Sequence, residues 1–92
     1  MGKPAVRDPE LASHMDDLYR DGAKVGSGST ADAVRHERLT NTAVGGKLHT
    51  QKAENYAEAL RRWLRKNPNA KPGDRAAAEN VLKDLEDALK GH

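Results

Sequence analysis

The sequence has no cysteine, no phenylalanine and no isoleucine, and only one tryptophan and two tyrosines. Without cysteine it forms neither a disulfide nor a zinc–thiolate site, so it can work in a reducing or an oxidising compartment. No apolar run is long enough for a signal peptide or a membrane span. Because aromatic and β-branched residues are scarce while alanine, leucine and charged residues are abundant, helices are favoured over sheets.

Ninety-two residues are enough for one domain with a small core. The chain is 36% hydrophobic and 33% charged, which places it near the edge of foldability. Its net charge is only +2, but residues 47–66 carry six lysines and arginines against two glutamates. This local excess of positive charge is a weak electrostatic footprint for a polyanion.

The clearest predicted helix spans residues 50–66, with Thr50 as its cap. Its inward-facing residues recur at helical spacing, namely Ala53, Tyr56, Ala57, Leu60, Trp63 and Leu64. Two prolines and a glycine end this helix in residues 67–73. A last helix is predicted from a cap at Asp74 to about Lys90, and it packs antiparallel on the preceding one as an αα-hairpin. Its inward-facing residues are Ala78, Val81, Leu82, Leu85, Ala88 and Leu89.

A shorter helix is predicted over residues 29–39, with Ser29 or Thr30 as its cap. Its inward-facing residues are Ala31, Val34 and Leu39. Residues 42–49 are predicted either as a short β-hairpin or as an irregular loop. The predicted fold is therefore a small, mainly α domain with a C-terminal αα-hairpin and room for one short β-hairpin.

Residues 1–15 look partly foreign to this domain. The triplet Ser13-His14-Met15 resembles the scar that a cloning site leaves before an inserted gene. We therefore predict a vector-derived or disordered leader, followed by a single domain over residues 16–92. The alternative is a short native helix from Pro9 to Arg20, with Pro9 in its first turn.

The chemically richest stretch is residues 45–53, at the entry to the helix over residues 50–66. A helix N-terminus presents unpaired N–H groups and attracts anions. The residues that suit a phosphodiester are small, cationic or able to titrate near neutral pH: Gly45, Gly46, Lys47, His49 and Lys52. The alternative for the same stretch is a plain loop, followed by a helix cap with solvated lysines.

Six short segments, in the same order along about two thirds of the chain, carry a resemblance to a known class: residues 28–35, 44–49, 51–53, 63–64, 67–70 and 74–75. With them the chain resembles the C-terminal toxin tips of bacterial polymorphic toxins, the Rhs-repeat and contact-dependent growth-inhibition effectors. The resemblance implies a monomeric domain of a larger secreted effector, delivered into the cytoplasm of a neighbouring bacterium. It also implies a cognate immunity protein that keeps kin unharmed.

Many such tips are ribonucleases, often against tRNA, so we predict RNA cleavage by transesterification at a 2′-hydroxyl, without a cofactor. The sequence lacks the clustered ligands of the zinc-dependent and HNH nuclease tips, which favours a metal-independent reaction. The predicted roles are a general base or acid (His49), holders of the scissile phosphate (Lys47, Lys52, Arg35), a second proton-transfer group (His36 or Glu37) and substrate-binding or positioning residues (Thr30, Asp32, Gly45, Gly46).

Two alternatives come from other functional classes. The first is a non-catalytic helical domain that docks on a protein or an RNA, which the uneven charge and thin core also suit. The second is a metal-dependent DNase tip, for which Asp32, Glu37 and Glu54 are the available ligands. The glycine-rich residues 21–29 lack the Lys-Ser/Thr pattern of a phosphate loop, so no nucleotide cofactor is implied.

Overall fold

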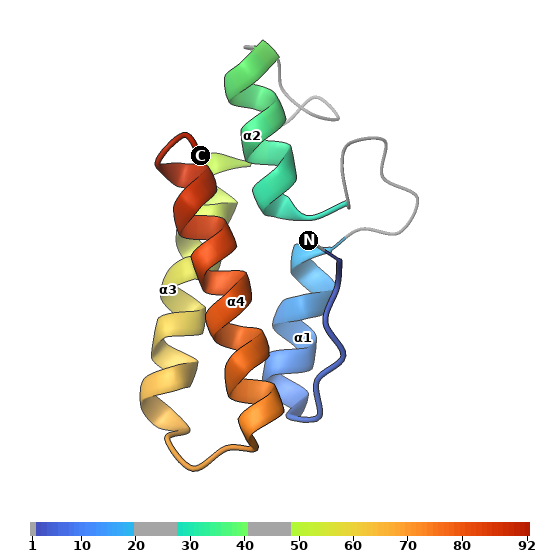
Figure 1. Ribbon diagram of the computed structural model, residues 1–92, viewed down its shortest axis with the longest axis vertical. Coiled ribbons are helices and arrows are strands. Elements are labelled where there is room, and N and C mark those ends of the chain that lie inside the picture. Colours follow the sequence, from blue (N-terminus) through green and yellow to red (C-terminus); the bar gives the residue numbers. More distant parts are fainter. Residues whose placement is uncertain (1, 20–27, 41–48) are drawn as a thin grey trace.

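The computed structural model describes residues 2–19, 28–40 and 49–92, and these form four helices (Figure 1). The helices are α1 (Pro9–Leu18), α2 (Thr30–Thr40), α3 (Thr50–Lys66) and α4 (Pro72–Leu89). Within the described ranges the only β pairing is an isolated bridge between Tyr19 and Ser29. The prediction of a small helical domain is confirmed. The predicted β-hairpin falls, apart from its last residue, outside the described residues.

Helices α3 and α4 lie side by side and antiparallel, joined by a short connection, as Figure 1 shows. Helix α1 packs on α3, while α2 packs on both α3 and α4. The predicted αα-hairpin is therefore present, and its turn is held by Arg75. The guanidinium of Arg75 donates to the carbonyl oxygens of Leu64 and Asn67 at 3.0 and 2.7 Å. The bond to Leu64 satisfies a carbonyl group at the end of α3, and the Asn67 carbonyl also accepts the Ala70 N–H at 3.2 Å.

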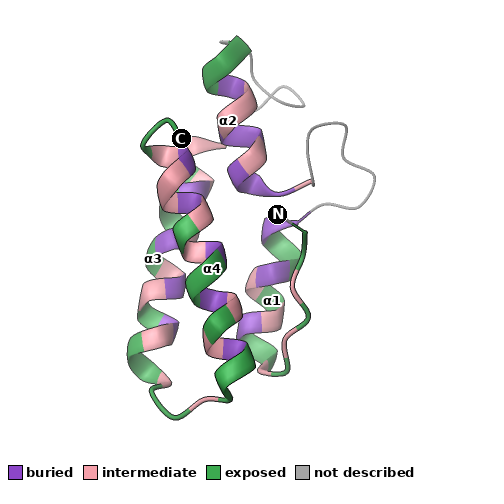
Figure 2. Cartoon of the chain, viewed as in Figure 1, coloured by how far each residue is buried: buried purple, intermediate pink, exposed green. Residues whose placement is uncertain are grey.

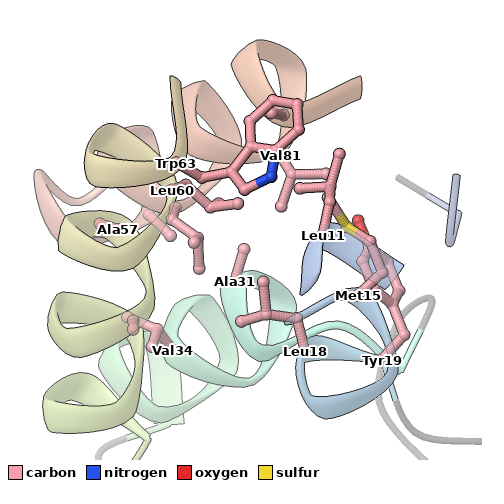
Figure 3. Packing of buried hydrophobic residues seen from close by; sticks show 14 residues of the cluster. Leu11, Met15, Leu18, Tyr19, Ala31, Val34, Ala57, Leu60, Trp63 and Val81 are labelled. Carbon is pink, nitrogen blue, oxygen red and sulfur yellow. The ribbon is translucent and has the colours of Figure 1, made fainter. Parts of the chain in front are cut away.

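One buried cluster joins all four helices (Figures 2 and 3). Trp63 of α3 is its largest fully buried side chain, and Leu11, Leu60 and Leu85 are buried in the same cluster. The apolar spacing along α3 and α4 thus predicted the core correctly. On α2 the inward placement of Leu39 was wrong, because this side chain is 86% exposed. Residues 38–40, which end α2, are solvent-exposed (Figure 2).

The caps of α3 and α4 differ from the prediction. The N-cap of α3 is His49, and Thr50 is the first helical residue. In α4 the N-cap is Lys71, followed by Pro72 at the first helical position, where a missing N–H costs nothing. Asp74 is turned away from its own helix, and its carboxylate accepts N–H groups of the N-terminal segment instead. Only the α2 cap is as predicted, since the Ser29 hydroxyl accepts the Asp32 N–H at 3.0 Å.

The N-terminal residues are an integral part of this fold. Helix α1 begins at Pro9, as in the alternative prediction, and it buries Leu11 and Met15 in the core. The carboxylate of Asp74 accepts the backbone N–H groups of residues 7 and 8 at 3.0 and 2.9 Å. Asp8 in turn caps α1 through the Leu11 N–H at 2.9 Å and accepts the indole N–H of Trp63 at 3.0 Å. The origin of residues 1–15 stays a prediction, but part of that segment stabilises the domain.

The hydrogen bonds to the Asp8 carboxylate make the stability of the domain depend on pH in the acid range. The Leu11 N–H, and after it the Trp63 indole, hold the pKa of Asp8 below its ordinary value of 3.8 against the opposing effect of partial burial. A lowered pKa means that the stabilisation is present above about pH 4 and is lost as the pH falls through the folded-state value. Urea unfolding measures the free energy of unfolding at each pH. Between about pH 5 and 2 we expect it to fall more steeply for the wild type than for Asp8→Asn. Glu79→Gln, which removes an exposed carboxylate of α4, is the matched control.

Candidate functional site

The structure brings His49 and Glu37 together, although twelve residues separate them in the sequence. The Nδ1 atom of His49 lies 2.6 Å from the Oε2 atom of Glu37. The backbone N–H of His49 donates to the other carboxylate oxygen at 2.8 Å. One carboxylate thus fixes both the backbone and the imidazole ring of His49.

The position of each partner follows from its helix. Glu37 lies on the buried side of α2, one turn beyond Ala33 and Val34, and its side chain is 4% exposed. His49 stands at the N-cap of α3 without a side-chain cap bond of its own. Glu37 supplies an acceptor there from the neighbouring helix. The His49 side chain is 21% exposed, so part of it is accessible to a ligand.

This contact fixes the chemistry of the imidazole. An ionised carboxylate only accepts hydrogen bonds, so its contact with Nδ1 requires a hydrogen on that nitrogen. In the neutral ring Nε2 is then the nitrogen with the free lone pair, and it can accept a proton from a substrate. The carboxylate also stabilises the imidazolium that such a transfer produces. The arrangement is that of a histidine base oriented by a buried acid.

Among the predicted phosphate holders, Lys52 is well placed. It lies three residues beyond His49, and residues at this separation are neighbours on a helix surface. The first turn of α3 also presents N–H groups without intrahelical acceptors, where an anion is favoured. The predicted contributions of Lys47, Gly45 and Gly46 fall outside the described residues.

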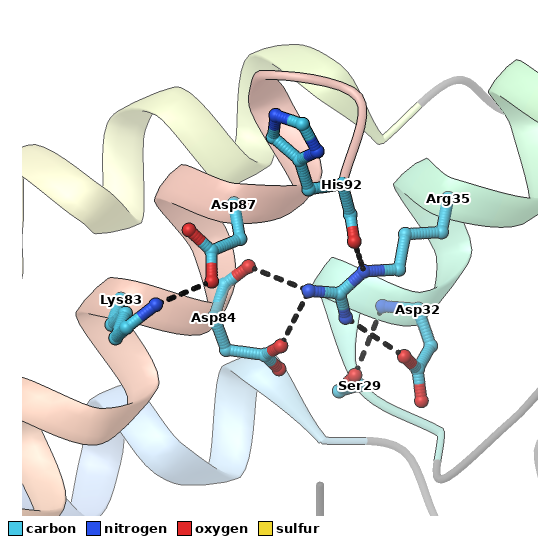
Figure 4. A network of polar contacts seen from close by, with 7 residues as sticks. All are labelled: Ser29, Asp32, Arg35, Lys83, Asp84, Asp87 and His92. Atoms are coloured by element: carbon cyan, nitrogen blue, oxygen red, sulfur yellow. Dashed lines mark hydrogen bonds and ion pairs between the residues drawn. The ribbon is translucent and has the colours of Figure 1, made fainter.

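Arg35 is engaged elsewhere (Figure 4). Its guanidinium pairs with Asp84 of α4 at 2.6 Å and with Asp32 at 3.0 Å, and its Nε donates to the carbonyl oxygen of His92 at 3.2 Å. It also donates to the main-chain oxygen of Asp84 at 3.1 Å. Burial lowers the pKa of Arg35, but the side chains of Asp84 and Asp32 outweigh this effect and raise the pKa above its ordinary value. The side chain therefore ties α2 to α4, and its geometry gives no support to a phosphate-binding role.

The other candidate residues of α2, which are Thr30, Asp32 and His36, have different surroundings and do not form one site. Asp32 holds Arg35, as predicted for a positioning residue, and Arg35 in turn contacts α4. The Thr30 hydroxyl is buried and donates to the carbonyl oxygen of Leu18 at 3.2 Å, which links α2 to α1. His36 is partly exposed and directly precedes Glu37. Adjacent helical residues project about 100° apart, so His36 does not share the direction of Glu37.

The orienting role of Glu37 was missed in the sequence, where it was a candidate for proton transfer. A signal did exist, because Glu37 continues the spacing of the buried residues Thr30, Ala33 and Val34. A carboxylate on the buried side of a helix requires a partner. The partner itself could not be read from the spacing, since it belongs to another helix.

Across residues 2–19, 28–40 and 49–92, no three histidine or acidic side chains are grouped so that they could hold a metal ion. In the same residues no helix is long and apolar enough to cross a membrane. No protein-family model, curated protein or solved structure matches this chain.

Proposed function

We propose that this domain is a ribonuclease toxin tip of a bacterial polymorphic toxin, and that it cleaves RNA without a metal ion. The observation that carries the chemical part is the Glu37–His49 pair, in which a buried carboxylate orients a partly exposed imidazole. The toxin context comes from the sequence resemblance. The immunity protein, delivery into a target bacterium and preference for tRNA are parts of the same proposal.

In this mechanism Nε2 of His49 removes the proton from a ribose 2′-hydroxyl. The resulting oxygen nucleophile attacks the adjacent phosphorus, and the bond to the 5′-oxygen of the next nucleotide breaks as a 2′,3′-cyclic phosphate forms. Glu37 keeps the hydrogen on Nδ1 and stabilises the imidazolium. It is a positioning residue, because the ring lies between it and the substrate.

The developing negative charge on the phosphate requires nearby donors. The Lys52 ammonium and the N–H groups of the first turn of α3 supply them beside His49. The departing 5′-oxygen needs a proton from the side opposite the attack, so a second group must deliver it. His36 remains our candidate for that group.

The test is incubation of the purified chain with total tRNA, with and without EDTA, followed by a denaturing gel. We expect EDTA-resistant fragments from the wild type and a loss of rate by about 10²–10⁴-fold in His49→Ala. Glu37→Gln should also be strongly impaired, because its amide can donate to Nδ1 and favour the wrong tautomer. Circular dichroism of each variant separates loss of the site from loss of the fold.

A non-catalytic interaction domain is the second candidate, favoured by the fact that the Glu37–His49 bonds also join α2 to the start of α3. On this alternative the pair serves only the fold. It predicts intact RNA with the wild type and a His49→Ala variant that differs only in stability. Cleavage that persists in a folded His49→Ala variant would contradict the proposed mechanism.

A further inference from the structure

Helix α3 carries a row of cations on one side of its surface. Lys52, Arg62 and Lys66 belong to this row, and no ion pair or hydrogen bond joins their side chains to the described residues. Their spacing of ten and four residues places them within an arc of about 80° on a helix with 3.6 residues per turn. The residues between them in the same arc are uncharged, namely Asn55 and Ala59. We call Lys52, Arg62 and Lys66 the cationic row.

The other two cations of this helix are used within the molecule. Arg61 pairs with Glu86 of α4 at 2.8 Å and with Glu58 at 3.4 Å, and Arg65 pairs with Glu58 at 3.4 Å. The bond to Glu86 raises the pKa of Arg61. Helical geometry places both arginines at least about 60° outside the arc of the cationic row. The positive charge of α3 is therefore divided into a compensated side and an uncompensated side.

The cationic row runs along most of α3, and its two ends have different surroundings. From Lys52 to Lys66 it extends about 21 Å, at 1.5 Å per residue. Its first end adjoins His49. At its other end Lys66 lines an open pocket of about 480 Å³, together with Arg7 and Lys71.

Two acidic residues also line this pocket, Asp8 and Asp74. The Asp74 carboxylate accepts two backbone N–H groups, and one Asp8 oxygen accepts from Leu11 and Trp63. The hydrogen-bonding capacity of these carboxylates is thus largely used inside the protein. With three cationic and two acidic side chains in its lining, the pocket still carries a small excess of positive charge.

We infer that the cationic row binds the sugar–phosphate backbone of a single-stranded RNA segment that extends from His49 toward the turn between α3 and α4. This inference rests on the proposed function for the choice of RNA as the polyanion. At 3.4 Å per stacked nucleotide, the 21 Å of the row corresponds to about six nucleotides. The row contains no aromatic side chain for base stacking, so it holds RNA without reading its sequence.

The test measures binding without cleavage, so that it does not depend on the chemistry at His49. A fluorescent 12-nucleotide single strand of 2′-O-methyl RNA, which lacks the attacking hydroxyl, is titrated with the full chain at 50 to 400 mM salt. Three phosphate contacts predict a slope of about −2 in a plot of log affinity against log salt concentration. Arg62→Gln/Lys66→Gln should flatten this slope to about −0.7 and weaken binding at least tenfold at 50 mM salt.

The matched control is Arg61→Gln/Arg65→Gln, which removes the same charge from the same helix. It should leave the slope and the affinity within about twofold of the wild type, and a three-nucleotide strand should bind at least tenfold more weakly than the 12-nucleotide strand. Equal weakening by both double variants, or equally tight binding of polyglutamate, would overturn the inference. Intact RNA in the cleavage assay, combined with the predicted slopes, would reject the ribonuclease and leave the cationic row standing.

Discussion

Replacing Trp63 with alanine is expected to lower the free energy of unfolding by about 3–5 kcal/mol. Trp63 is the largest fully buried side chain, and it is 1% exposed. Its ring fills the space between α3, α1 and α4, and its indole N–H donates to Asp8 at 3.0 Å (Figure 3). Truncation removes the buried apolar surface, leaves a cavity and deprives the carboxylate of one donor. Domains are typically stable by about 5–15 kcal/mol, so this variant should be close to unfolding.

Urea unfolding followed by circular dichroism measures this effect, and two further variants separate its causes. Trp63→Phe keeps most of the apolar volume but loses the indole donor, so we expect a loss of about 1–2 kcal/mol. Leu39→Ala removes the 86% exposed leucine of α2 and should change stability by less than about 0.5 kcal/mol. A Trp63→Ala variant as stable as Leu39→Ala would contradict the described core.

Arg35→Ala is expected to lower the free energy of unfolding by about 2 kcal/mol. The side chains of Arg35 and Asp84 are 29% and 15% exposed, so solvent screens their attraction only in part. The expected loss therefore lies between the ~1 kcal/mol of surface pairs and the 3–5 kcal/mol that breaking a fully buried pair costs. A double-mutant cycle with Asp84→Ala should show a coupling of about 1 kcal/mol or more, because both residues lose the same contact.

The same variant tests whether Arg35 has a role beyond the fold. If the guanidinium serves only to join α2 to α4, folded Arg35→Ala should cleave RNA at a rate within a few-fold of the wild type. Assays at low temperature, where the variant stays folded, make this comparison possible. A variant of unchanged stability that has lost cleavage would reverse our assignment and restore the predicted phosphate contact.

The helices of this fold were largely predictable because their signals are local. The apolar spacing over residues 50–66 predicted α3 with its observed bounds, and the prolines at 68 and 72 marked the turn to α4. Caps were less predictable, because the decisive groups come from other elements. Asp74 looks like a cap in the sequence, but it serves the backbone of residues 7 and 8.

The sequence indicated which segment could hold the candidate site, but not how its side chains contact one another. His49 and Lys52 were predicted as site residues because a glycine-rich entry to a helix attracts anions. The orientation of His49 by Glu37 depends on how α2 crosses α3, and residue spacing contains no such information. The contacts of Arg35 could not be read from its neighbourhood in the sequence, since two of its partners lie 49 and 57 residues away in the chain.

Helices α1 and α2 are held by hydrogen bonds to residues of α3, of α4 and of the segment after α4, and these bonds limit the order in which the domain can fold. Helix α1 is anchored through residues 63 and 74, and α2 through residues 84 and 92. Among helices that are neighbours in sequence, α3 and α4 share the most extensive contact, so their hairpin is the unit that can form early. During synthesis α1 and α2 therefore emerge from the ribosome before their partners at residues 63, 74, 84 and 92 exist. The complete domain assembles only when its last helix is available, and until then the apolar sides of α1 and α2 remain open to chaperones and proteases.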